Sequence, residues 1–421
     1  SERGLVVFNP LSWARDGLVE VPPDTADRLP DAVRAAGQLA QVDGEPRLLL
    51  PAANVPSLGF ATSAPVESAR EPLTVTPELL ENHFYRLALN ERGQIVSLFD
   101  KRREREVLAR GGRGNVFQAF EDKPMAFDAW DVDIYYGEKM AEADDLVEAA
   151  VEESGPLRGA LRLVWRFRDS TITQRLTLVA DSPRIDFRTE VDWHEAQVLL
   201  KVAFPVSVRA TRATYDIAFG SVERPTHWNT SWDWARFEVP AHKWADLSEG
   251  DYGVALLNDC KYGYDIHNNV MRLTLIKSAV RPDPLADKGR HVFTYSLLPH
   301  TGDWRLGNVP REAYALNYPL LAVAAQVGAP VRFSLAEVDA SNVIIETVKR
   351  AEDDPDAWII RLYEFAQSRR AARLTFGRRL RRAVECNLVE QDERPVEFDA
   401  AGLRFDIAPF EIKTFKVWFK V

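Results

Sequence analysis

Hydrophobic and polar residues alternate over much of the chain, and this period of two predicts β-strands. Residues 84–90 alternate, a turn follows at Arg92-Gly93, and residues 94–99 alternate again, which is typical of a β-hairpin. The further segments that we predict as strands are 157–168, 171–180, 184–193, 197–204, 210–218, 253–257, 271–276 and 291–298. Because no rhythm of strand, helix and strand is visible, repeated antiparallel strands favour a large sandwich.

Shorter patterned segments lie on both sides of this region. Residues 5–8 and 17–21 predict strands, and residues 39–42 and 46–50 predict a β-hairpin that turns at Asp43-Gly44. Residues 27–37 predict a short helix, and the Pro- and Ser-rich stretch 52–76 predicts a linker. Residues 358–363, 373–376 and 410–421 predict strands near the end. We therefore predict an all-β protein in which a large antiparallel β-sandwich (75–345) is flanked by smaller N- and C-terminal β domains (1–74 and 346–421).

Composition agrees with a β-rich protein, since 3 Met stand against 11 Trp, 11 Tyr and 21 Phe, with 25 Pro and 22 Gly spread along the 421 residues. The net charge of −10 argues against nucleic acid or an anionic membrane as a partner. The uncharged run 313–331 is interrupted by Pro and Gly and is interpreted as buried strand and turn. Two Cys without CxxC spacing favour a reducing, cytoplasmic setting. The start at Ser-Glu-Arg-Gly, without Met, suggests the later part of a longer protein.

Common catalytic signatures are missing, and the scattered His residues predict no metal site in this chain. One candidate cluster spans residues 120–133, where carboxylates including Asp128 and Asp131 are interleaved with aromatics including Trp130. Carboxylates that accept hydroxyl hydrogen bonds, beside an aromatic face, suit a sugar site. A rigid structural loop would have the same composition, so both interpretations stay open.

Two further clusters are equally open between binding and structure. Residues 223–244 contain four Trp, which fits either a carbohydrate platform or a loop that docks on another domain. Asp259 follows an apolar strand, where Asn-Asp is ordinary turn chemistry. Asp283 and Asp287 could be a glycosidase acid and base, but their spacing on a loop does not give the separation that such a pair needs.

The same clusters carry a family resemblance. The segments Val-Val-Phe-Asn-Pro-Leu-Ser-Trp (6–13), Glu-Asp-Lys-Pro (121–124), Asp-Ala-Trp-Asp (128–131), Glu-Arg-Pro-Thr-His-Trp-Asn (223–229), Asn-Asp-Cys-Lys-Tyr-Gly (258–263) and Thr-Tyr-Ser-Leu-Leu-Pro-His (294–300) closely resemble the C-terminal half of family 38 α-mannosidases. Residues 409–414 resemble that family's closing strand. The match covers essentially the whole chain in order, and it is nearest to the cytosolic and vacuolar branch with its bacterial relatives.

This resemblance implies a retaining glycoside hydrolase that releases α-linked mannose and depends on zinc. In the family, the Asp nucleophile, the acid and the zinc ligands belong to an N-terminal α/β barrel and a helical bundle, and nothing in this sequence matches either. The resemblance therefore implies no catalytic residue and no metal ligand in this chain. It also implies that loops of the large β domain line the substrate cleft, and the candidates are Asp128, Trp130, Asp131, Asp259, Lys277 and Asp283.

We thus expect the non-catalytic C-terminal part of an α-mannosidase, inactive alone, whose partners are α-mannoside glycans and the missing catalytic domain. The family branch also suggests a homo-oligomer. The alternative is a self-standing carbohydrate-binding module that uses its Trp- and Asp-rich loops. A mutarotase-like enzyme is a weaker idea, suggested by the resemblance to a similar sandwich. We further expect an exposed aromatic patch at residues 228–244, where the catalytic domain would cover the chain.

Overall fold

The computed structural model of the protein describes residues 3–42, 44–63, 73–326 and 330–420. The chain forms two compact units: Ser1–Ser68, Ile217–Ser221 and Tyr318–Val421 make up the first, and Ala69–Asp216 and Val222–Asn317 make up the second. The sheets are antiparallel and strands predominate, so the predicted all-β sandwich class is confirmed. The division into three domains at the predicted boundaries stays a prediction.

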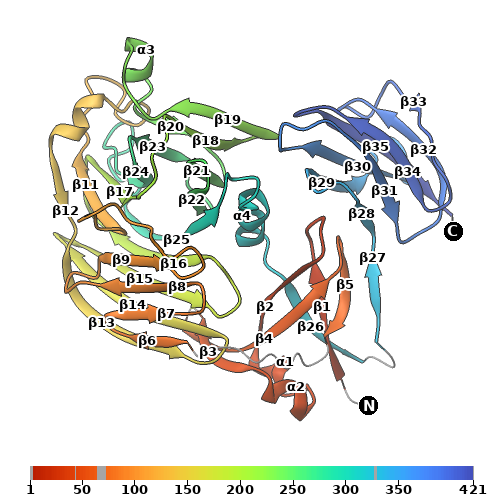
Figure 1. Cartoon of the computed structure of the whole chain (residues 1–421), viewed down its shortest axis with the longest axis horizontal. Helices are drawn as coiled ribbons and strands as arrows, with labels where there is room; N and C mark the ends of the chain where they lie inside the picture. Colours follow the sequence, from red (N-terminus) through yellow and green to blue (C-terminus); the bar gives the residue numbers. More distant parts are fainter. Residues whose placement is uncertain (1–2, 43, 64–72, 327–329, 421) are drawn as a thin grey trace. The chain divides into compact units, whose positions relative to one another are not determined.

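The largest sheet, which can be followed in Figure 1, has nine strands. Its order is β13 (Asp145–Ser154), β14 (Arg158–Phe167), β15 (Ser170–Val179), β16 (Ile185–Trp193), β25 (Gly289–Thr301), β22 (Tyr252–Asn258), β21 (Trp244–Ser248), β18 (Arg212–Ile217) and β19 (Gly220–Pro225). Side chains along β15 alternate between buried and half-buried positions, because one face of the sheet packs on the core.

Two further sheets complete the second unit. The six-stranded sheet has the order β12 (Met140–Glu142), β11 (Val116–Glu121), β17 (Val198–Pro205), β24 (Val270–Lys277), β23 (Gly263–His267) and β20 (Val239–Pro240). The five-stranded sheet has the order β10 (Arg105–Glu106), β9 (Ile95–Asp100), β8 (Tyr85–Leu89), β7 (Leu79–Glu81) and β6 (Thr74–Thr76).

One hydrophobic core joins these three sheets. Phe117 of β11 meets Trp165 of β14 edge to face, with ring centroids 5.2 Å apart, so the six- and nine-stranded sheets pack against each other. Within the nine-stranded sheet, Phe187 of β16 stacks on Tyr295 of β25 at 5.0 Å between ring centroids. Large aromatic side chains thus fill the interior between the sheets.

The first unit contains four smaller sheets. Two of them contribute to one core: β26 (Leu321–Gln326), β1 (Arg3–Asn9), β5 (Gly59–Ser63) and β27 (Arg332–Ser334) form one, and β2 (Arg15–Val21), β4 (Glu45–Val55) and β3 (Gln38–Val42) form the other. The other two contribute to a second core: β28 (Ala336–Val338), β31 (Arg370–Phe376) and β34 (Gly402–Ile407), with β29 (Val343–Arg350), β30 (Ala357–Glu364), β35 (Ile412–Phe419), β32 (Leu380–Cys386) and β33 (Arg394–Pro395).

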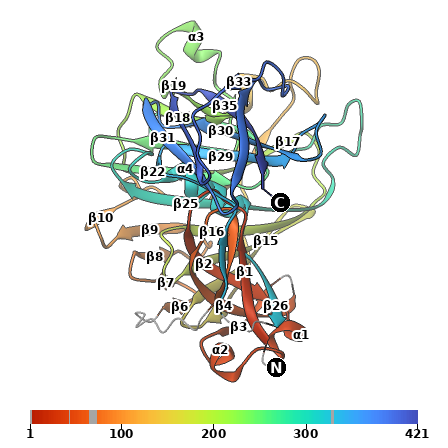
Figure 2. The ribbon, with the colours of Figure 1, turned by 90° about the vertical axis from the view of Figure 1, so that its right-hand side faces the viewer.

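Helices are short in the described ranges: α1 (Pro23–Ala26), α2 (Asp31–Ala35), α3 (Ser231–Trp234), α4 (Val309–Asn317) and the 3-10 helix η1 (Ile134–Glu138). The helix α2 confirms the short helix predicted within residues 27–37. Figure 2 shows α3 at the tip of a loop that projects from β19. Within the described ranges, none of the helices is long and apolar enough to cross a lipid bilayer.

Two predictions from the sequence are wrong. The stretch 52–76 is not a linker as a whole, since β4 continues to Val55 and β5 follows; its residues 64–72 lie outside the described residues. Pro51 is tolerated in β4 because it lies beyond Leu49, the last residue of β4 that pairs with β3, and faces Leu18 of β2 on the other side. The run 313–331 begins as the end of α4, and its strand β26 is partly exposed rather than buried.

Candidate functional site

The loop between β11 and η1 carries three of the predicted site residues, Asp128, Trp130 and Asp131. The Oδ2 atom of Asp128 accepts hydrogen bonds from the backbone N–H groups of Val280 at 2.6 Å and Arg281 at 3.2 Å. Asp carboxylates commonly order loops through such bonds to the backbone. Asp128 therefore links its own loop to the segment that follows β24, and its place in a substrate cleft stays a prediction.

Lys277, the last residue of β24, makes a second link between the same two segments. Its ammonium group pairs with the carboxylate of Asp122, whose side chain is only 2% exposed. Burial raises the pKa of Asp122, and the nearby Asp128 and Asp133 add to the increase, while Lys277 opposes it. The structure thus brings Lys277 and Asp128 together around Asp122, which was not among the predicted site residues.

A tight turn in this loop directs two aromatic rings toward solvent. The backbone N–H groups of Trp130 and Asp131 donate to the Phe127 carbonyl at 2.7 and 2.9 Å. Phe127 and Trp130 are 65% and 77% exposed, and their ring centroids lie 5.8 Å apart. Asp131 is exposed beside them, and its carboxylate has no hydrogen bond or ion pair within the described part of the chain. This surface offers apolar ring faces and one available carboxylate.

Asp259 and Asp283 use their carboxylates locally. Asp259, in the turn after β22, accepts a hydrogen bond from the backbone N–H of Thr294 on β25 at 2.9 Å. Asp283 accepts one from Leu285 at 2.8 Å within its own loop. Both are exposed, and no hydrogen bond or ion pair between described residues joins either carboxylate to the loop of Trp130. Asp283 lies on the segment that follows β24, to which the Asp128 carboxylate is hydrogen-bonded. The Asp259 carboxylate is instead hydrogen-bonded to β25.

A buried ionic cluster holds η1, the element that follows the Trp130 loop, and sequence analysis missed it. The side chain of Lys201 on β17 is 0% exposed and pairs with Asp265 of β23 and with Glu238. The Tyr136 hydroxyl of η1 donates to Glu238 Oε1 at 2.7 Å. Burial alone would lower the pKa of Lys201, but the two carboxylates outweigh burial and raise it. The ammonium group therefore stays charged and connects the sheet to η1.

The Trp-rich segment 228–244 is exposed for the most part, as predicted. Trp232 on α3 is 78% exposed, and Trp228 and Trp234 are 42% and 46% exposed. Trp244 contradicts the prediction, because it is 2% exposed and its ring centroid lies 5.2 Å from that of Trp304. Its position in β21, a strand within the nine-stranded sheet, explains this burial.

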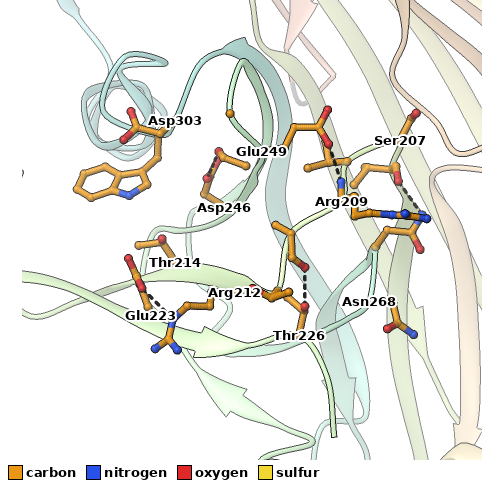
Figure 3. A pocket seen from close by; sticks show the side chains of 18 of the residues that line it. Ser207, Arg209, Arg212, Thr214, Glu223, Thr226, Asp246, Glu249, Asn268 and Asp303 are labelled. Atoms are coloured by element: carbon orange, nitrogen blue, oxygen red, sulfur yellow. Dashed lines mark hydrogen bonds and ion pairs between the residues drawn. The ribbon is translucent and has the colours of Figure 1, made fainter. Parts of the chain in front are cut away.

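A pocket of about 1110 Å³ lies in the second unit and is drawn in Figure 3. None of the six predicted site residues lines it, although Glu223, Thr226 and His227 of the Trp-rich cluster do. Its other polar lining residues include Ser207, Arg209, Arg212, Thr214, Asp246, Glu249, Asn268 and Asp303. They come from six separate segments of the sequence, so no local pattern could have predicted the pocket.

Metal-binding chemistry is not assembled in the residues that the structure describes. No group of three or more His, Cys, Asp or Glu side chains among them is placed to hold a metal ion. The described residues therefore do not fit a zinc site.

Comparison with known proteins gives matches along most of the chain. The model of the glycosyl hydrolases family 38 C-terminal domain matches residues 80–285, and that of the family 38 C-terminal beta sandwich domain matches residues 342–415. Alpha-mannosidase 2C1 of Homo sapiens is 38% identical over 97% of this chain and 39% of its own length. Alpha-mannosidase of Saccharomyces cerevisiae is 31% identical over 72% of this chain and 31% of its own length.

A solved structure shares the fold. The alpha-mannosidase from Enterococcus faecalis V583 superposes with a TM-score of 0.74 over 99% of this chain and 56% of that chain, at 14% identity. This likeness shows a common fold. The chain spans about two fifths of the length of the human relative that it matches.

Proposed function

Because the chain belongs to glycosyl hydrolase family 38 and matches its C-terminal domains, we propose that it serves as the C-terminal part of an α-mannosidase. In this role it provides a scaffold and one wall of the cleft that receives α-linked mannose in glycans or oligosaccharides. The matching relatives are named alpha-mannosidases and are longer than this chain, which supports the proposal. The sequence-based expectations of a cytoplasmic location and a homo-oligomer stay predictions.

We place the hydrolytic chemistry and its zinc outside this chain. Support comes from the described residues, among which no group of His, Cys, Asp or Glu fits a metal ion. The role proposed here is to hold and orient a substrate. No nucleophile, acid or zinc ligand is therefore assigned to any residue of this sequence.

The exposed Phe127 and Trp130 rings are the observation that carries the cleft-wall proposal. Their centroids lie 5.8 Å apart, and the Asp131 carboxylate is exposed next to them. A sugar ring has an apolar C–H face that packs on an aromatic ring and hydroxyl groups that donate to a carboxylate. The links from Asp128 to Val280 and Arg281 hold the loop in place, so this surface is ordered before a sugar binds.

The test measures hydrolysis of 4-nitrophenyl α-mannoside in the presence of zinc. We expect no hydrolysis by residues 1–421 alone and full hydrolysis by the longer protein that includes its upstream part. In that longer protein, Trp130→Ala should raise KM by about tenfold or more, since about 1.4 kcal/mol of lost binding corresponds to a factor of ten. Phe398→Ala is the control, because Phe398 is an exposed aromatic residue, 41% exposed, that belongs to the first unit and lies outside this loop.

Two results would contradict the proposal. Robust hydrolysis by residues 1–421 alone would show that the chain holds its own catalytic residues. An unchanged KM in Trp130→Ala would exclude this surface from the cleft.

The alternative is a self-standing carbohydrate-binding module, which the exposure of Trp130 and Trp232 favours. Titration of residues 1–421 with mannobiose, followed by Trp fluorescence, separates the two functions. Micromolar binding by this chain alone supports the module, whereas no response leaves the scaffold role.

A further inference from the structure

The four carboxylates that line the pocket of Figure 3 all have partners within the protein. The pairs are Glu223 with Arg212 at 2.9 Å, Glu249 with Arg105 at 2.6 Å, Asp303 with Arg305 at 3.0 Å, and Asp246 with His300 at 2.7 Å. Against the effect of burial, hydrogen bonds from the Arg209 backbone and from Arg105 lower the pKa of Glu249. These acidic groups are thus already engaged and offer little to a cation.

Two arginines of the pocket, in contrast to its carboxylates, form no ion pair with any residue that the structure describes. Arg110 and Arg209 both line it and are exposed, and within the described part of the chain no carboxylate forms an ion pair with either guanidinium, although the charge of Arg209 contributes to the lowered pKa of Glu249. A guanidinium presents a planar set of N–H donors that matches the oxygens of a phosphate or carboxylate. In a chain whose net charge is −10, these two available cations make this pocket suited to an anion.

The remaining polar lining is neutral and able to bind hydroxyl groups. The side chains of Thr214 and Asn268 line the pocket and have no hydrogen-bond partner among the described residues. Ser207 and Thr211 add further hydroxyl groups. Besides the His227 imidazole, the aromatic ring in the lining belongs to Trp304, which is only 3% exposed and offers no face for stacking. A ligand here would be held by charge and hydrogen bonds rather than by an aromatic platform.

We propose that this pocket binds an anionic saccharide, a polyhydroxylated ligand that carries a phosphate or carboxylate group, with Arg110 and Arg209 as its anion contacts. The volume of about 1110 Å³ exceeds that of most small-molecule sites, so it accommodates more than one sugar unit. None of the residues of the Phe127–Trp130 surface lines this pocket, so the proposal is independent of the cleft-wall function.

The test is isothermal titration of residues 1–421 with mannose 6-phosphate, glucuronate, mannose and inorganic phosphate. The first two probes distinguish a phosphate from a carboxylate ligand, and the last two separate the sugar part from the anion part. We expect mannose 6-phosphate or glucuronate to bind more tightly than mannose or inorganic phosphate, and binding to weaken as salt rises.

Variants assign the binding to this pocket. The double variant Arg110→Gln/Arg209→Gln should weaken binding of the anionic sugar by about tenfold or more, because charge-assisted hydrogen bonds are lost. Arg166→Gln is the matched control, an exposed arginine of β14 away from the pocket, and it should bind as the parent does.

Three outcomes would overturn the proposal. The first is the absence of binding by both anionic sugars. The second is equal binding of mannose and mannose 6-phosphate, which would make the charge irrelevant. The third is unchanged binding in a folded Arg110→Gln/Arg209→Gln protein, with folding checked by circular dichroism.

Discussion

The Nζ atom of Lys201 lies 2.7 Å from Oδ2 of Asp265 in the interior of the sandwich, where the two side chains are 0% and 5% exposed. The same ammonium group pairs with Glu238, to which Tyr136 of η1 donates a hydrogen bond. One buried cation therefore connects β17, β23 and η1. The stability of the fold depends on the Lys201 ammonium group, because without it the Asp265 and Glu238 carboxylates would be left unpaired in a poorly solvated site.

We expect Lys201→Met to lower the free energy of unfolding by about 3–5 kcal/mol, the usual cost of leaving buried charges unpaired. Urea denaturation followed by circular dichroism measures this change. The control is Lys139→Met, because Lys139 is 77% exposed in its pair with Glu121 and such surface pairs contribute about 0–1 kcal/mol. A loss below about 1 kcal/mol in Lys201→Met would contradict the importance of the cluster.

A second buried network joins the faces of the sandwich. The Tyr295 hydroxyl donates to Asn115 Oδ1 at 2.6 Å and accepts from Gln174 Nε2 at 2.7 Å. We expect Tyr295→Phe to lower the free energy of unfolding by about 1–3 kcal/mol, because buried polar atoms would lose their partner. Tyr262→Phe, at a 60% exposed tyrosine, is the control and should change little in the same urea experiment.

The first unit has a backbone contact that requires glycine. A Cβ atom at Gly59 would lie 2.0 Å from the Phe333 carbonyl oxygen, where β5 pairs with β27. Since backbone atoms cannot turn away as a side chain can, we expect Gly59→Ala to destabilise by about 1–3 kcal/mol or more. Gly250→Ala is the control, because its Cβ would meet nothing within 4 Å. Equal melting temperatures for the two variants would contradict this prediction.

The alternating strands of the second unit were predictable because each has one buried face. β15 shows this most clearly, since its residues alternate strictly between buried and half-buried positions. β13 was missed because it is the edge strand of its sheet, and it carries exposed Glu residues and two register shifts that break the period of two. The end of α4, residues 313–317, was interpreted as strand or turn because it belongs to a long uncharged run.

The candidate site could be predicted only in part. The composition of residues 120–133 predicted Trp130 and Asp131 as candidates, and both side chains are exposed in the structure. The links from Asp128 to Val280 and from Asp122 to Lys277 join residues more than 150 positions apart, and no local pattern encodes them. The pocket with Arg110 and Arg209 required six separate segments to meet. Pairings of this kind follow from the fold and not from local sequence.

His267 gives a prediction for pH. Its ring lies against that of Trp228, with centroids 4.0 Å apart and the planes tilted by 31°. Burial lowers the pKa of His267 below the ordinary value of about 6.5; Asp265 opposes this effect, and Arg272 and His227 add to it. Between the folded pKa and about 6.5 the unfolded chain binds more protons than the folded chain. The contribution of neutral His267 to the free energy of unfolding is therefore complete above about pH 6.5 and is lost as the pH falls through the folded pKa.

We expect His267→Gln to flatten the decrease in unfolding free energy between about pH 7 and pH 5, measured by urea denaturation. An imidazole pKa above 6.5 for His267, measured by NMR titration, would show that the sign is reversed.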